Sequence, residues 1–151
     1  MTSKALENLV KTGILKEEPA DKTEIDGLVR SARARLLDAK VQGLSKDSKF
    51  DLAYAAAHAF ALAALRWHGF RTERRYIVFQ CTQHTLSLDA PAWKTLADCH
   101  NKRNVAEYEG YLDVGDALLE ELMRIADELS RKVAKLPNED EPGRGRKTHG
   151  G

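Results

Sequence analysis

The feature that most constrains the fold is the segment KFDLAYAAAHAFALAALRWHG, residues 49–69. Apolar residues lie on most sides of a helix through this segment, so we expect a helix that is buried at the centre of the protein. Ser48 is expected to begin this helix and Gly69 to end it. Its longest apolar run, residues 53–65, contains His58 and is shorter than the roughly 18 residues that a membrane-spanning helix needs.

Helical periodicity also dominates the rest of the chain, and no strand is expected. One apolar stripe, for example, joins Ile25, Ala32, Leu36 and Ala39 at helical spacing. Helix start signals are expected at Ser3, Thr23, Thr72, Asp89 and Asp113, and glycine stops at Gly13, Gly43 and Gly110. The sequence therefore predicts an all-α protein, a bundle of about five main helices plus a short N-terminal helix.

The chain has 151 residues, a length that suits one domain with a single core. We expect residues 1–22 to form a short helix and a linker, residues 23–136 the bundle, and residues 137–151 a polar, flexible tail. A net charge of +1 leaves any binding of nucleic acid or membrane to local patches. Two cysteines and the lack of an apolar leader are typical of a soluble cytoplasmic protein.

The helix expected to begin at residue 89 changes character along one face. Trp93 and Leu96 are apolar, but the same face continues with His100, Arg103 and Glu107. Either the helix emerges into solvent, where Arg103 and Glu107 form an i,i+4 ion pair, or this face meets a ligand or a second subunit. The ion pair alone is a weak explanation, because arginine before glutamate is the less favourable order along a helix.

The segment RNVAEYEG, residues 103–110, resembles a degenerate form of the HEPN motif, in which four to six residues separate an arginine from the histidine that follows it. Some HEPN-like families carry Arg-x-x-Ala-Asp/Glu-Tyr here, which Arg103, Ala106, Glu107 and Tyr108 match. The alanine-rich segment 50–69 is similar to the central helix of that superfamily, and residues 28–43 suit its first long helix. The resemblance covers about residues 23 to 135.

Resemblance to HEPN proteins implies a helical bundle that dimerises, with the two motif helices lining a shared cleft. Active members cleave RNA without a metal, and others bind RNA or nucleotides or partner a nucleotidyltransferase in toxin–antitoxin or defence pairs. In this chain Tyr108 stands where the motif has histidine. Arg103 can supply a cation for phosphate, whereas a tyrosine is a poor base at neutral pH. The resemblance therefore implies a dimeric RNA- or nucleotide-binding protein with weak or no nuclease activity.

Two alternatives stay open. The first is an active, metal-independent endoribonuclease toxin in which His100 or Glu107 replaces the missing histidine as base. The second is a protein-interaction module, in which the residues around Arg103 fix an interface with a copy of the chain, a nucleotidyltransferase or an antitoxin. The candidate catalytic residues are thus Arg103, His100, Glu107 and Tyr108.

A second cluster of interest is RWHGFRTERRY, residues 66–76, where arginines alternate with aromatic residues. Such a cluster can hold phosphates and stack bases. It can equally be a turn whose arginines pair with acids elsewhere in the chain. The candidate RNA-binding residues from both clusters are Arg71, Arg74, Arg75, Arg103, Asn104 and Tyr108.

A zinc site is the remaining candidate, because Cys81 and His84 share a helix face and Cys99 and His100 lie further along the chain. Cys99 and His100 point about 100° apart on a helix, which makes joint coordination awkward. Buried cysteines are the better interpretation, so no metal or cofactor is expected. His58, in the central helix, is expected to be a hydrogen-bonded core residue.

Overall fold

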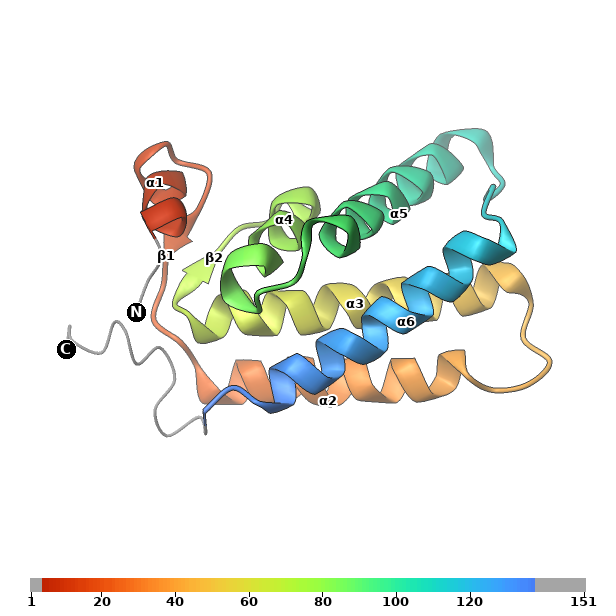
Figure 1. Cartoon of the computed structure of the whole chain (residues 1–151), viewed down its shortest axis with the longest axis horizontal. Helices are drawn as coiled ribbons and strands as arrows, with labels where there is room; N and C mark the ends of the chain where they lie inside the picture. Colours follow the sequence, from red (N-terminus) through yellow and green to blue (C-terminus); the bar gives the residue numbers. More distant parts are fainter. Residues whose placement is uncertain (1–3, 138–151) are drawn as a thin grey trace.

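The computed structural model describes residues 4–137, and this part of the chain folds as a helical bundle (Figure 1). The predicted all-α class is confirmed. The elements are α1 (Lys4–Lys11), β1 (Lys16–Glu17), α2 (Lys22–Ala39), α3 (Lys46–Trp67), β2 (Phe70–Arg71), α4 (Arg75–Thr85), α5 (Ala90–Glu109) and α6 (Asp116–Ala134).

Helix α3 lies at the centre of the bundle, as its apolar surface predicts. Helix α2 packs along one side of α3, α4 and α5 lie along the other side, and α6 crosses in front of α3 between them (Figure 1). Its many alanines let the neighbouring helices approach closely, and its buried aromatic residues fill the gaps between them. Phe50, Tyr54 and Phe60 are all buried in the core that these helices share.

The glycine stops other than Gly43, and one helix start, agree with the sequence. Gly110 has φ +82° and donates its N–H to Ala106 O (2.8 Å), which ends α5 in a left-handed conformation that favours glycine. The Asp89 side chain accepts from Ala92 N (3.0 Å) and begins the same helix. Gly13 also has positive φ, but α2 ends at Ala39, before Gly43.

The other predicted starts are displaced by two to three residues. Asp21 rather than Thr23 caps α2, and Ser45 rather than Ser48 caps α3. Helix α4 begins after Arg74 and not at Thr72, and Gly115 rather than Asp113 precedes α6. Ser3 lies outside the described residues.

A two-residue antiparallel pairing contradicts the expectation of no strand. Lys16 pairs with Arg71 and Glu17 with Phe70, so the segment after α1 is hydrogen-bonded to the turn between α3 and α4. Leu6 and Leu15 from the N-terminal segment are buried in the same core as the bundle. No helix within residues 4–137 is long and apolar enough to cross a membrane. Residues 138–151, which hold nearly all of the predicted tail, lie outside the described part.

Candidate functional site

Helix α5 leaves the core halfway along its length. Its buried residues end at Cys99, and the last turns expose Val105 and Tyr108, followed by Tyr111 after the helix. Tyr108 is 91% exposed. The loss of apolar residues after Leu96 therefore marks the point where α5 extends beyond the core.

Before it leaves the core, α5 directs two polar side chains toward a tyrosine of α3. The Tyr54 hydroxyl lies 2.9 Å from His100 Nδ1, and the two rings are stacked with centroids 6.5 Å apart. The Arg103 guanidinium carbon is 5.8 Å from the centroid of the Tyr54 ring, and that of Arg75, in the first turn of α4, is 5.7 Å from it. We call Tyr54, Arg75, His100 and Arg103 the Tyr54 cluster.

Two further polar residues complete the surroundings of this cluster. Asn104 places its amide nitrogen 3.2 Å from His100 Nε2, so both ring nitrogens of His100 have a partner. Within residues 4–137, Arg103 forms its ion pair with Asp51 of α3 (3.6 Å) rather than with Glu107. Glu107 is exposed. The i,i+4 ion pair considered from the sequence is therefore not the interaction that holds Arg103.

The rings of the cluster are neutral and its two arginines carry the positive charge. Burial raises the pKa of Tyr54, although the nearby Arg75 and Arg103 partly offset this. Burial, and then the charge of Arg75, lowers the pKa of His100, so its imidazole is uncharged at pH 7. Arg75 and Arg103 can each donate to an anion such as phosphate, and the acids beside Arg103 are Asp51, which pairs with it, and Asp47, which lines the same cavity.

His58 lies one turn after Tyr54 on α3 and faces the same region. Its ring packs edge-on against Phe79 with centroids 5.7 Å apart. Burial, followed by the charges of Arg75 and His100, lowers its pKa to about 4. His58 is thus a neutral, half-buried residue beneath the cluster.

The second arginine cluster divides into two groups. Arg66 is buried, and its guanidinium bonds to Glu24 (2.9 Å) and to the carbonyl of Pro19 (2.7 Å). Arg71 bonds to Glu18 (3.0 Å) and to Glu24. These two arginines therefore pair with acids from the N-terminal half of the chain.

The remaining arginines of that segment differ from each other. Arg74 is exposed at the start of α4, and Arg75 turns toward Tyr54. The structure thus brings Arg75, but not Arg71, together with Arg103. Asn104 bonds His100, while Glu107 and Tyr108 lie on the exposed part of α5 and have no recorded contact with the cluster.

The cysteine and histidine residues considered for zinc are not gathered into a site. Cys81 and Cys99 are buried thiols, and burial raises the pKa of each to about 12. Across residues 4–137, no three histidine, cysteine, aspartate or glutamate side chains are grouped so that they could hold a metal ion.

Sequence reasoning missed Tyr54 and Asp51 as members of the site. The available signal was the spacing of Asp51, Tyr54 and His58, which puts three polar groups on one face of a helix that is otherwise apolar. Comparison of the chain with protein-family models, with curated proteins and with solved structures gave no match.

Proposed function

We propose that this chain is a HEPN-like protein that binds RNA or a nucleotide through the Tyr54 cluster, with weak or no nuclease activity. One observation carries the proposal: the guanidiniums of Arg75 and Arg103 come from different helices and lie 5.7 and 5.8 Å from the centroid of the same buried ring. Two planar forks that lie around one ring are suited to grip the oxygens of adjacent phosphates of a strand.

The surroundings of Arg103 provide room for a base beside the phosphate. A cavity of about 210 Å³ adjoins Arg103 and is lined by Asp51, Ala106 and Tyr111, among others. Tyr111 is 62% exposed, so its ring is accessible to a nucleobase. Aromatic stacking tolerates any base, which fits a site without sequence preference.

Weak nuclease activity follows from the state of His100. A general base must have a ring nitrogen that can take the proton of the RNA 2′-hydroxyl. Both nitrogens of His100 already have partners, Tyr54 at 2.9 Å and Asn104 at 3.2 Å. Catalysis would require one of these bonds to break, whereas phosphate binding by the two arginines would not.

An active, metal-independent endoribonuclease is the second candidate function. The observation that favours it is that His100 is uncharged and lies beside both arginines of the cluster. Among the candidate bases, His100 is the stronger choice, because Glu107 is exposed and is not part of the cluster.

We further propose that the exposed end of α5 binds a second copy of the chain. Val105, Tyr108 and Tyr111 are large exposed apolar or aromatic residues within seven positions of one another. Covering them in a symmetric dimer would bring two Tyr54 clusters toward a common surface. Sedimentation analysis of the wild type and of Tyr108→Glu tests this proposal: the wild type should be dimeric and the variant monomeric. A monomeric wild type would contradict it, and a nucleotidyltransferase or an antitoxin would then be the remaining candidate partner.

The binding site is tested with a fluorescent RNA of mixed sequence, about 12 nucleotides long. Arg75→Ala and Arg103→Ala should each weaken binding by about tenfold, since a charge-assisted hydrogen bond contributes about 1.5–3 kcal/mol. Each should also lower the slope of log affinity against log salt concentration by the amount that corresponds to about one phosphate contact. Arg74→Ala is the matched control, because Arg74 is exposed and lies next to Arg75 without contacting the Tyr54 ring.

The same RNA, incubated with the protein and EDTA, tests for cleavage. Little or no cleavage supports the binding function. Rapid cleavage that disappears in His100→Ala supports the second candidate. Binding that is equal in Arg74→Ala, Arg75→Ala and Arg103→Ala would refute the Tyr54 cluster as the site.

A further inference from the structure

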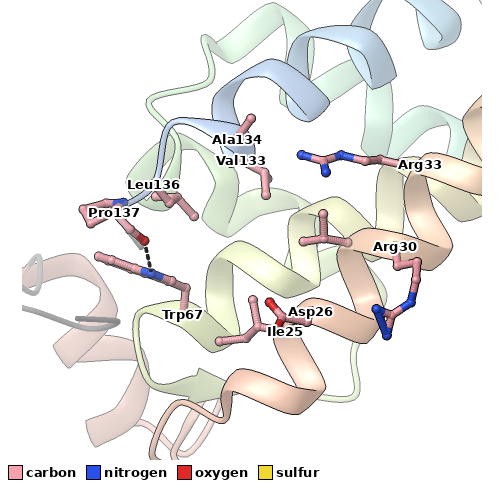
Figure 2. A pocket seen from close by; sticks show the side chains of 10 residues that line it. Ile25, Asp26, Arg30, Arg33, Trp67, Val133, Ala134, Leu136 and Pro137 are labelled. Carbon is pink, nitrogen blue, oxygen red and sulfur yellow. Dashed lines mark hydrogen bonds between the residues drawn. The ribbon is translucent and has the colours of Figure 1, made fainter. Parts of the chain in front are cut away.

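A groove between α2 and α6 lies away from the Tyr54 cluster and shares no residue with it. Its volume is about 560 Å³, within the range of roughly 300–1,000 Å³ that is usual for ligand sites. Figure 2 shows its lining side chains, which come from α2, from the end of α3 and from the end of α6. The larger apolar lining residues include Ile25, Val29, Trp67, Val133 and Leu136.

The α2 side of the groove is positively charged. Arg30 and Arg33 line it, and Figure 2 shows the Arg33 guanidinium pointing from α2 toward the Val133 side. Neither arginine forms an ion pair with any residue between 4 and 137. Asp26, the acid among the lining residues of the described chain, is paired with Lys22 at 3.0 Å. The groove therefore combines an apolar floor with two arginines that have no acidic partner in this part of the chain.

The apolar surface continues beyond the groove along α2. Leu37 is 68% exposed and Val41 is 53% exposed. Leu37 follows Arg33 by four residues and so lies close to its side of α2, and Val41 comes two residues after the end of that helix. Exposed aliphatic residues in line with an apolar groove are typical of a surface that a partner covers.

We propose that this groove binds an acidic amphipathic helix of another protein. The groove lies between helices and presents no sheet edge, so an extended peptide would bury its own N–H and C=O groups without partners. A helix satisfies those groups internally and can place apolar residues at i, i+3, i+4 and i+7 into the groove. Acidic residues beside that stripe would then meet Arg30 and Arg33.

RNA fits this surface less well than an acidic helix does. Trp67 is the aromatic ring of the groove, but it is buried, and its Nε1 donates to Pro137 O (3.3 Å). The rest of the floor is aliphatic, so a base has no exposed ring on which to stack. The inference goes beyond the proposed function, because it assigns a protein partner to a different surface.

The probe is a fluorescent peptide of about 18 residues, or five helical turns, with leucines at i, i+3, i+4 and i+7 and glutamates beside them. A second peptide carries lysine in place of each glutamate. Fluorescence anisotropy with the full chain should show the acidic peptide binding at least about tenfold more tightly than the lysine peptide. The double variant Arg30→Glu and Arg33→Glu should reverse this preference.

Arg35→Glu is the matched control, because Arg35 is exposed on the same helix but bonds to Ser31 and does not line the groove. It should leave the acidic peptide's affinity within about twofold of wild type. Equal binding of the two peptides, or no effect of the double variant, would overturn the proposal. So would an effect of Arg35→Glu as large as that of the double variant.

Three further outcomes would assign the groove to another occupant and overturn the proposal. One is RNA binding that is lost in the Arg30→Glu and Arg33→Glu variant but kept in Arg103→Ala. Another is a dimer that Leu37→Glu dissociates, which would identify a second copy of the chain. The last is peptide binding that appears only after Glu139→Gln, Asp140→Asn and Glu141→Gln in the full chain, which would identify its own acidic residues as the competitor.

Discussion

Arg66 offers the most direct test of what holds the N-terminal segment to the bundle. Its side chain is 1% exposed, and its Nε donates to Glu24 at 2.9 Å. The other guanidinium nitrogens donate to backbone carbonyls of Glu18 (2.9 Å), Pro19 (2.7 Å) and Phe70 (3.3 Å). One buried cation thus joins α3, the start of α2, the segment before it and the strand β2.

Replacing Arg66 with alanine should destabilise the protein by about 3–5 kcal/mol, the usual cost of removing one partner of a buried ion pair. Three backbone carbonyls would lose their donor. Of the two arginines that bond to Glu24, Arg71 alone would remain. Glu24 is 28% exposed, so water can solvate part of its charge, and we expect the lower end of that range. For a chain of this length, such a loss lowers the melting temperature by about 10 °C.

The assay is urea unfolding followed by circular dichroism, with two comparison variants. Arg66→Lys keeps the charge but not the planar fork. It should cost more than half of the unfolding free energy that Arg66→Ala costs. Arg71→Ala is the matched control, because Arg71 shares both acids with Arg66 but is 32% exposed. It should cost about 1 kcal/mol or less. The reasoning is refuted if Arg66→Ala costs no more than Arg71→Ala.

Three other perturbations have defined outcomes. The pKa of His58 is about 4 in the folded protein and 6.5 in the unfolded chain, so protonation between these values favours unfolding. The free energy of unfolding should therefore drop by about 3 kcal/mol as pH falls from 7 to 4. Urea unfolding at pH 7, 5.5 and 4 should show a clearly smaller drop in His58→Gln. Gly110→Ala should cost about 1 kcal/mol through its positive φ alone, since an added Cβ meets no atom within 4 Å; a change in melting temperature of less than about 1 °C would contradict this. Arg75→Gln should raise the pKa of His100 in an NMR titration, because the charge of Arg75 helps to lower it, whereas Arg74→Gln should not.

The fold was predictable because helical periodicity and burial follow from local sequence. The alanine-rich segment has apolar residues all round, and only a central helix can bury them. Helix starts were harder to predict, because several residues with similar side chains compete for one position. Ser45 and Ser48 lie three residues apart, and the packing of α3, rather than the chemistry of serine, decides that Ser45 accepts from the Ser48 N–H.

The arginine cluster shows a second limit of sequence reasoning. Arg71 and Arg75 are four residues apart, and both follow the central helix. Arg71 belongs to β2, which carries it toward Glu18 and Glu24, whereas Arg75 lies in the first turn of α4, over Tyr54. Because the backbone changes from strand to helix between the two residues, their side chains have different partners. Because the strand pairs with Lys16 and Glu17, this separation depends on a contact between residues more than fifty positions apart.

The spacing of Asp51, Tyr54 and His58 indicates a polar face on the central helix, but it does not indicate which residue the Tyr54 hydroxyl meets, and the position of Tyr54 in the structure explains why. Its ring is buried and stacks on Phe50 with centroids 6.0 Å apart, as a core residue does. The hydroxyl is the part that matters for the site, and its partner His100 lies forty-six positions further along the chain. The two meet because α4 and α5 pack over α3. The same aromatic ring therefore fills the core and orders the polar side chains above it, so the geometry of the Tyr54 cluster depends on the packing of the whole bundle.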